Sequence, residues 1–260
     1  MVVYVHMDIK NKIIVITGAS EGIGAATARV VAREGAKVVL AARSDEKLAA
    51  LAKELNNKEK DTAITVRTDM HNPADIQNLI DRAIKTYGRI DVLINNAGQG
   101  MYTPVESIDI DKYRDIMDLN VYAPLRAMQI IIPIMRKQGG GMILNISSRV
   151  SKNYFPNLAA YASTKYALNA ISLTARQELS KDNIVVSVMH PKMTSTNFSK
   201  NAAGAHPDYG RIQADRAAGA NANSTPSRPN PSNSPNIDTP EAVAENIAEL
   251  IHSEAPEAEM

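Results

Sequence analysis

A tyrosine, a lysine and a serine in this chain have the spacing of a proton-transfer site. Tyr161 and Lys165 are four residues apart, and Ser148 precedes the tyrosine by thirteen residues. Side chains four residues apart on a helix lie on one face. An ammonium beside the phenol favours the phenolate, so a tyrosine with an ordinary pKa of about 10 could exchange a proton near neutral pH. With Ser148 holding a substrate oxygen, the three groups suit hydride transfer at a carbonyl, provided that a nicotinamide lies opposite.

Composition limits the classes of protein to which the chain can belong. The 260 residues carry a net charge of +1 without a basic block, which argues against nucleic-acid binding. The sequence contains no cysteine, and its five histidines lack zinc-ligand spacing, so we expect no thiolate chemistry and no metal site. No apolar run approaches the roughly 20 residues of a membrane span. We therefore expect a cytoplasmic protein without a membrane or nucleic-acid partner.

The chain alternates between short apolar runs and amphipathic helices. Six runs predict buried strands at 13–16, 38–40, 64–66, 92–94, 142–146 and 184–188. Ser44 and Asn72 are predicted N-caps of two of the helices, and Pro73 fits the first position of the second. A long helix is predicted at 111–136, and another carries Tyr161 and Lys165. Repeated βα units predict an α/β fold with a doubly wound parallel sheet and helices on both faces.

The first predicted strand leads directly into a glycine-rich turn. Gly18 permits the tight turn, Gly22 would let the backbone approach a pyrophosphate, and Gly24 would allow close helix–strand packing. The helix that follows offers free N–H groups and the positive end of its dipole. Ligands of open α/β sheets bind beyond the carboxyl ends of the strands, which is where this turn lies. The turn therefore predicts a dinucleotide site, although its spacing is Gly-x3-Gly-x-Gly and not the common Gly-x-Gly-x2-Gly.

Further motifs follow the glycine turn in a fixed order: Asn95-Asn96-Ala97-Gly98 after the fourth strand, Asn120, Ser148, and the Tyr161 and Lys165 pair. In this combination the chain resembles the short-chain dehydrogenases/reductases from about residue 12 to residue 198. The resemblance implies a Rossmann-type domain that uses NAD(H) or NADP(H) and needs no metal. It also implies a small-molecule carbonyl or alcohol as substrate and assembly as a homodimer or homotetramer.

The resemblance implies a role for each motif residue. Tyr161 would be the general acid/base, Lys165 would lower its pKa and hold the nicotinamide ribose, and Ser148 would polarise the substrate carbonyl. Asn120 would anchor a water that relays protons through Lys165. The substrate would contact Ser148, Tyr154 and Tyr161. Besides Tyr161 and Lys165, the cofactor would contact Gly18, Ser20, Glu21, Gly22, Ile23, Gly24, Asp69, Met70, Asn96, Ala97, Gly98, Thr194 and Thr196.

The end of the second strand bears on the choice of cofactor. NAD-selective sites place an acid there, which accepts the ribose 2′-hydroxyl and repels a 2′-phosphate. This chain has Ala42 followed by Arg43, and an arginine offers bidentate donors to a phosphate. An exposed arginine without a ligand is the alternative. Glu21 argues the other way, because NADP-using relatives often have a basic residue at its position. On balance the sequence favours NADP(H) over NAD(H).

The chain departs from the family pattern at two places. Pro191-Lys192 stands where Pro-Gly is usual, so the lysine either bends the loop differently or adds a charge near the nicotinamide pocket. At the other end, a helix with Val243, Ile247 and Leu250 is present, but the polar, acidic segment 253–260 predicts no final strand. A shortened sheet and a truncated sequence are the two explanations.

Domain organisation follows from these patterns. We expect a single dinucleotide-binding and catalytic domain at 12–260, preceded by an extension at 1–11 in which Met7 is a candidate start. Residues 200–238 are poor in large apolar side chains and cannot bury enough surface to order themselves. By resemblance they form a flexible insertion that covers the substrate, with a plain linker as the alternative.

The sequence thus predicts an oxidoreductase that transfers hydride between NADP(H) and a carbonyl or secondary alcohol. One alternative is an NAD-dependent alcohol dehydrogenase of the same family. Another is a nucleotide-binding regulatory protein without catalysis, against which the intact Asn120, Ser148, Tyr161 and Lys165 argue. His190, at the end of the sixth predicted strand, is interpreted as a loop or packing residue.

Overall fold

The computed structural model describes residues 7–198, 200–204 and 237–260. The predicted insertion at 200–238 therefore lies mostly outside the described residues, and so does the start of the predicted N-terminal extension. Residues 7–11 pack against the domain: Ile9 is fully buried in the core, and the Met7 amide bonds the carbonyl of His252. The folded domain thus begins at least five residues before the expected boundary at residue 12.

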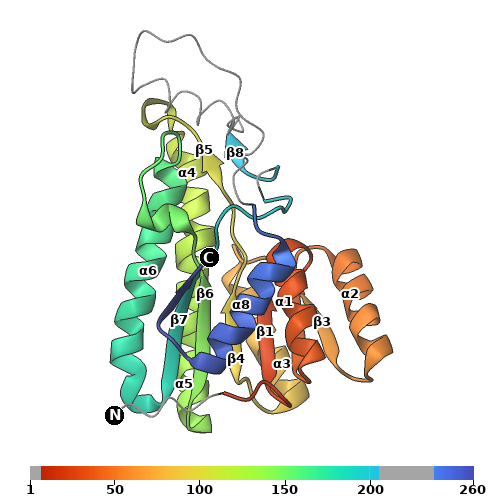
Figure 1. Ribbon diagram of the computed structural model, residues 1–260. Helices are drawn as coiled ribbons and strands as arrows, with labels where there is room; N and C mark the ends of the chain where they lie inside the picture. The colour runs from red at the N-terminus through yellow and green to blue at the C-terminus, as the bar shows by residue number, and fades with distance from the viewer. Residues whose placement is uncertain (1–6, 199, 205–236) are drawn as a thin grey trace.

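Within the described residues, a parallel sheet of seven strands runs through the centre of the molecule in the order β3-β2-β1-β4-β6-β7-β9 (Figure 1). Apolar runs buried on both faces form its middle, as the sequence predicts. The strands are β1 (Ile13–Thr17), β2 (Lys37–Ala42), β3 (Ala63–Arg67), β4 (Val92–Asn95), β6 (Gly141–Ile146), β7 (Ile184–His190) and β9 (Glu257–Glu259).

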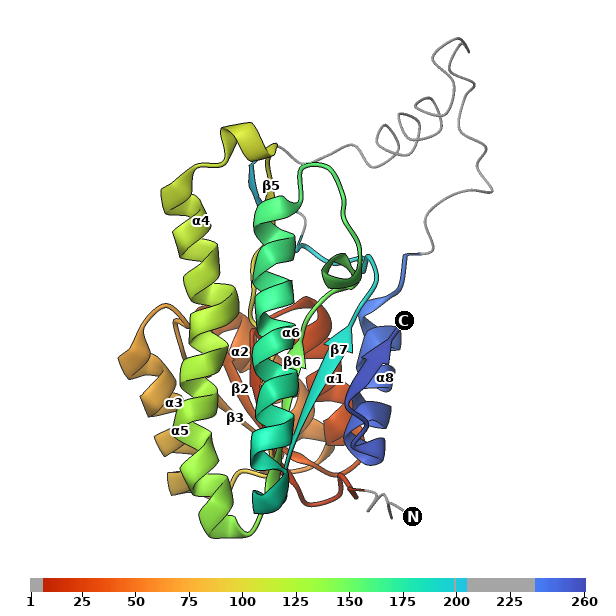
Figure 2. The same cartoon turned by 90° about the vertical axis from the view of Figure 1, so that its left-hand side faces the viewer.

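Helices cover both faces of the sheet, with α5 and α6 on one side and α1 and α8 on the other (Figure 2). This confirms the doubly wound α/β fold. The apolar stripe of α2 joins the core of α1 and α8, and that of α3 joins the core of α5. The helices are α1 (Gly22–Arg33), α2 (Asp45–Lys58), α3 (Pro73–Tyr87), α4 (Ile110–Met117), α5 (Ala123–Gln138), α6 (Ala159–Leu179) and α8 (Pro240–Ser253).

The N-caps lie where the sequence predicts them. The Ser44 side chain accepts from the Lys47 amide, and the Asn72 side chain accepts from the Ala74 amide with Pro73 at the first position of α3. These side chains satisfy backbone donors that a helix start leaves unpaired. Local sequence therefore fixes the residue at which the helix begins in two of the βα units.

The long helix predicted at 111–136 is interrupted by a π-helical turn, η2 (Asp118–Tyr122), between α4 and α5. Such single turns widen the helix by one residue and occur often at functional sites. Asn120, one of the predicted site residues, lies inside this turn and is buried. Hydrophobic periodicity continues through the segment, which is why the sequence predicts one uninterrupted helix.

The prediction that the final strand is missing was wrong. Strand β9 pairs in parallel with β7, with Val188 opposite Glu257 and His190 opposite Glu259. Its sequence, Glu-Ala-Glu, carries no apolar run because the strand lies at the sheet edge, where side chains can remain in contact with water. Backbone pairing holds the strand together with three side-chain contacts: from Lys152 and His190 to Glu257, and from Lys152 to Glu259.

Candidate active site

A cavity of about 1220 Å³ opens at the carboxyl ends of the strands. It extends from Arg43, which follows β2, to Ser148, Tyr161 and Lys165 beyond β6. Most of the residues predicted to bind the cofactor line it: Gly18, Ser20, Glu21, Gly22, Ile23, Arg43, Asp69, Met70, Asn96, Ala97, Gly98, Tyr161, Lys165, Thr194 and Thr196. The fold thus brings together residues that are up to 178 positions apart in the chain (Gly18 to Thr196).

The glycine turn leaves room that any side chain would fill. Gly18 has a φ of 65°, and a Cβ there would lie 2.9 Å from the Ala97 Cα. A Cβ on Gly24, which does not line the cavity, would lie 2.6 Å from the Asn96 side-chain nitrogen, so this glycine serves close packing. Glu21, the N-cap residue of α1, makes no side-chain hydrogen bond to the first turn of the helix. The first N–H groups of α1 therefore lie beside the cavity without a side-chain cap. This arrangement fits a pyrophosphate.

Thr17, which the sequence reading did not single out, joins the ends of β1 and β4. Its hydroxyl accepts from the amides of Asn96 (3.0 Å) and Ala97 (3.1 Å), and Asn96 Nδ2 donates to the Thr17 carbonyl at 2.9 Å. The hydroxyl of Thr17 lies beneath the loop of the Asn-Asn-Ala-Gly motif. A threonine directly before the first glycine is the signal in the sequence that identifies this contact.

Tyr161 and Ser148 meet at the floor of the cavity. Tyr161 is buried on α6 and lines the cavity together with Ser148, which follows β6. Burial raises the pKa of the Tyr161 phenol, and the Ser148 side chain offsets only part of this increase. The phenol is therefore held in its protonated form, beside a hydroxyl that can share a substrate oxygen with it.

Lys165 lies one turn further along α6, as the spacing predicts. Its amine is buried, donates to the carbonyl of Ile146 at 2.9 Å and lies 5.9 Å from the centre of the Tyr161 ring. Burial lowers the pKa of Lys165 to about 8. Burial thus drives both groups toward their neutral forms, and the lowering of the Tyr161 pKa by Lys165 stays a prediction.

Asn120 contributes to the site from beneath the cavity. Its Nδ2 donates to the carbonyl of Gln99 (2.8 Å) and to the hydroxyl of Thr164 (3.1 Å), and its Oδ1 accepts from the Gln99 amide. The π-helical turn thus connects the loop after β4 with helix α6. The contacts hold Gly98 close by, since a Cβ on that glycine would lie 3.1 Å from Asn120 Oδ1.

Among the described residues, no group of histidine, aspartate and glutamate side chains could hold a metal ion. No helix in the same part of the chain is long and apolar enough to cross a membrane.

The comparison with protein families identifies this arrangement. A family model described as short chain dehydrogenase matches residues 12–206, three quarters of the chain. The chain belongs to the short-chain dehydrogenase/reductase family.

Individual relatives and solved structures agree with this assignment. An uncharacterized oxidoreductase of Staphylococcus saprophyticus is 36% identical over 194 residues, which cover 74% of this chain and 78% of the relative. The fold superimposes on a 7α-hydroxysteroid dehydrogenase complexed with NADH and 7-oxo glycochenodeoxycholic acid, with a TM-score of 0.81, 26% identity, and coverage of 100% and 96% of the two chains. It also matches L-sorbose reductase from Gluconobacter frateurii, complexed with NADPH and L-sorbose (TM-score 0.78, 28% identity, coverage 98% and 97%).

The structure does not bring every predicted residue of this short-chain dehydrogenase to the cavity. Tyr154, predicted to contact substrate, is 85% exposed and stacks on Tyr166 with ring centres 6.0 Å apart. It is absent from the cavity lining, because the loop after η3 (Arg149–Lys152) carries its ring onto the outer face of α6. Phe155, its neighbour, does line the cavity.

Two residues near the cofactor end of the cavity have partners of their own. Glu21 pairs with Lys47 at 2.6 Å and accepts weaker hydrogen bonds from the amides of Asn197 and Asn201. The Lys47 contact is the main reason that the pKa of Glu21 lies below its usual range. Lys47, a lining residue missed by sequence reasoning, partly neutralises the acid that argued against a 2′-phosphate.

Proposed function

We propose that this short-chain dehydrogenase transfers hydride between NADP(H) and a carbonyl or secondary alcohol, with Tyr161 as the general acid/base. The observation that carries the proposal is that the side chains of Tyr161 and Ser148 line the same cavity as the dinucleotide motifs. A protonated phenol and a hydroxyl at one point can both donate to a single substrate oxygen. The buried amine of Lys165 lies near Gly98 of the Asn-Asn-Ala-Gly motif, since a Cβ on that glycine would lie 3.6 Å from it.

When bound, the nicotinamide supplies or accepts the hydride at the substrate carbon. In the reductive direction the Tyr161 phenol donates its proton to the substrate oxygen, which carries the developing negative charge. Ser148 donates a hydrogen bond to the same oxygen and keeps it within reach. Lys165 stabilises the phenolate that remains, since its amine can take up a proton near its pKa of about 8.

Preference for NADP(H) is supported by the end of β2. Ala42 provides no carboxylate at this position, and Arg43 is exposed where it lines the cavity. Lys47 is a second cation near this position. Its amine already contacts Glu21, so a bound phosphate would compete with Glu21 for this amine. The structural relatives do not decide the question: the sorbose reductase is complexed with NADPH and the hydroxysteroid dehydrogenase with NADH.

Two alternatives remain distinct in their consequences. An NAD-dependent alcohol dehydrogenase of the same family would use the same residues but would not respond to removal of Arg43. A nucleotide-binding regulatory protein would bind the dinucleotide without turnover. Oxidation of NADPH or NADH in the presence of diacetyl, followed by absorbance, separates these functions. Binding of both cofactors without turnover of diacetyl or of any ketone in a wider panel would support the regulatory alternative.

The substrate pocket has mixed polarity. Gln99, Tyr102, Val150 and Phe155 line it together with Ser148, whereas Met101 is buried outside the lining. We propose a small-molecule substrate and a homodimeric or homotetrameric enzyme in the cytoplasm. The family membership supports the small-molecule substrate and the assembly, and the location is a prediction.

A further inference from the structure

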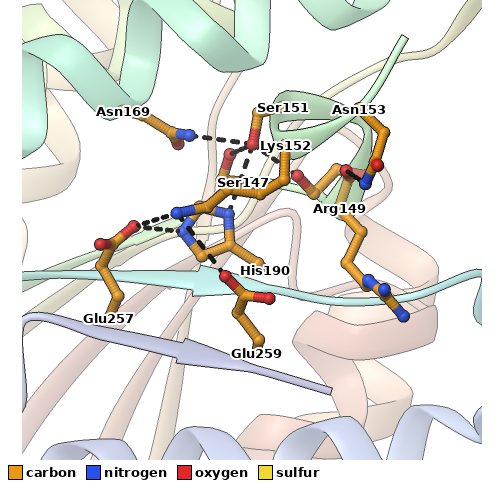
Figure 3. Close-up of polar contacts among 10 residues, drawn as sticks. Ser147, Arg149, Ser151, Lys152, Asn153, Asn169, His190, Glu257 and Glu259 are labelled. Atoms are coloured by element: carbon orange, nitrogen blue, oxygen red, sulfur yellow. Dashed lines mark hydrogen bonds and ion pairs between the residues drawn. The ribbon is translucent and has the colours of Figure 1, made fainter.

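A polar cluster behind Ser148 joins three segments that are far apart in the chain (Figure 3). It includes Ser151 from η3, His190 from the end of β7, and Glu257 from β9. Ser151 is 2% exposed and His190 is fully buried. The catalytic roles proposed above use none of these three side chains, and a histidine that only fills space would not need a charged partner.

The hydrogen bonds of Ser151 can be assigned from what each partner can offer. Its hydroxyl lies 2.6 Å from the carbonyl oxygen of Ser148, which can only accept, so the single hydroxyl hydrogen goes there. The Ser151 amide donates to the same carbonyl at 3.0 Å. Two donors from one residue therefore hold the peptide group that follows Ser148, while the Ser148 hydroxyl itself accepts from the amide of Val150 at 3.3 Å.

The two lone pairs of the Ser151 hydroxyl remain for donors. Asn169 Nδ2, on α6, takes one at 2.9 Å. His190 Nδ1 lies 3.3 Å from the same oxygen, and the hydroxyl of Ser147 lies at the same distance as a competing donor. Ser151 thus connects the serine loop both with the helix of Tyr161 and with the end of β7.

His190 transmits this contact to the C-terminal strand. Its Nε2 lies 2.8 Å from Glu257 Oε1, which also accepts from Lys152 Nζ at 2.9 Å. A carboxylate can only accept, so Nε2 carries a proton toward Glu257, and Nδ1 faces the Ser151 hydroxyl. The backbone pairing of β9 with β7 places Glu257 at this point.

We propose that Ser151 is a positioning residue for Ser148 and that the His190–Glu257 pair holds Ser151 in place from strand β9. This inference rests on the proposed function in one respect: it takes Ser148 as the hydroxyl that shares a substrate oxygen with Tyr161. Positioning acts on catalysis because a small displacement of a reacting group lowers the rate steeply. Positioning of Ser148 should leave dinucleotide binding unchanged, because other residues of the proposed site hold the dinucleotide.

The first test is Ser151→Ala, assayed with NADPH and diacetyl. Loss of the hydroxyl frees the peptide after Ser148, so kcat should fall about tenfold or more while the KM for NADPH stays unchanged. Tyr161→Phe is measured in parallel as the marker of the proposed function. Glu259→Gln is the matched control, because it keeps the backbone pairing with β7 and changes only a side chain that contacts Lys152 at 3.6 Å.

The second test separates the two nitrogens of His190. An asparagine amide reaches about as far as Nδ1 and a glutamine amide about as far as Nε2. His190→Asn keeps a donor toward Ser151 and loses Glu257, whereas His190→Gln keeps a contact with Glu257 and loses Ser151. If Ser151 is the point of action, His190→Asn should retain at least about threefold more kcat than His190→Gln, at comparable thermal stability.

The outcomes are distinguishable. Wild-type kcat in Ser151→Ala together with loss of activity in Tyr161→Phe would overturn the positioning role and leave the proposed function intact. Equal kcat in the two His190 variants would overturn the proposed role of the His190–Glu257 pair in holding Ser151. Wild-type kcat in Tyr161→Phe would instead refute the proposed function itself. If Ser151→Ala does not fold, the ratio of the two His190 variants decides.

Discussion

Asn120 makes both backbone hydrogen bonds of Gln99. Its Oδ1 accepts from the Gln99 amide at 2.9 Å and its Nδ2 donates to the Gln99 carbonyl at 2.8 Å, so a side chain in a π-helical turn acts as a neighbouring strand would. Removing it leaves two partly buried backbone groups without this partner. Asn120→Ala should therefore lower the free energy of unfolding by about 2 kcal/mol and reduce kcat, as denaturant unfolding and initial rates would measure.

The chain contains a control for this substitution far from the cavity. Asn56 makes the same pair of bonds with the backbone of Ala63, at 2.8 and 2.9 Å. Asn56→Ala should lower stability and leave kcat and both KM values unchanged. If the two variants lose activity to the same extent, the effect of Asn120 is one of overall stability and not of the site.

Removing the phenolic hydroxyl tests the general acid/base. Tyr161→Phe should leave NADPH binding nearly intact and lower kcat by roughly 100-fold or more, the loss expected for a positioned proton donor. Lys165→Ala should impair both NADPH binding and kcat. Tyr113→Phe removes a hydroxyl that bonds Ser163 outside the cavity lining and should keep wild-type rates. A Phe variant of Tyr161 with unchanged kcat would show that the proton comes from elsewhere.

Arg43 tests the choice of cofactor. Arg43→Ala should raise the KM for NADPH with little change for NADH, because one charge-assisted contact with a phosphate is worth roughly 1.5–3 kcal/mol. Arg67→Ala is the control: Arg67 lies opposite Ala42 on the neighbouring strand, outside the cavity lining. Equal use of NADPH and NADH by the wild-type enzyme would contradict the proposed preference before any variant is made.

Lys165 should make stability depend on pH. Its pKa is about 8 in the folded protein and 10.5 ordinarily, so between these values the unfolded chain binds the additional proton. Stability from this residue therefore rises as the pH increases from about 8 to 10.5, and below about 8 the folded state bears the cost of a buried ammonium.

Lys165→Met removes this cost. The melting temperature of the variant, relative to that of the wild type, should be higher at about pH 7 than at about pH 10. Lys137→Met, at an exposed position of α5, should show no such difference between the two pH values. A relative stability of Lys165→Met that is independent of pH would mean that the buried amine is not neutralised in the folded state.

The assembly can be tested directly. If the α5 and α6 helices pair with those of a second copy, light scattering at micromolar concentration should give at least twice the chain mass of 28.2 kDa. A purely monomeric mass would contradict the proposed homodimer or homotetramer.

The sequence predicted the central strands, the capped helices and the cavity lining because each has a local signal. Apolar runs such as 13–16 identify a buried strand, and a glycine turn after it identifies the dinucleotide site. Strand β9 has no such signal, since its Glu-Ala-Glu sequence becomes a strand only through pairing with β7. The position of Tyr154 and the links from His190 to Ser151 and Glu257 depend on tertiary contacts, which no spacing in the sequence encodes.

The pKa of Tyr161 illustrates the same limit. A lysine four residues away correctly predicts a shared helix face, but the sign of the shift depends on how deeply both groups are buried. Hydrophobic periodicity predicts which face of a helix is buried, but it does not predict the solvent exposure of a single side-chain atom. The protonation states of the site therefore require the structure.

The place of β9 in the chain has a consequence for biosynthesis. Its parallel pairing with β7 joins residues 188–190 to residues 257–259, so the ribosome produces every other strand of the sheet before this partner exists. A nascent chain that has reached residue 250 already contains Asn120, Ser148, Tyr161 and Lys165, yet it lacks the carboxylate that faces His190. Long-range pairings of this kind form late, because loop closure must precede them. If the His190–Glu257 pair positions Ser151 as proposed, full activity would follow only after β9 has left the ribosomal exit tunnel.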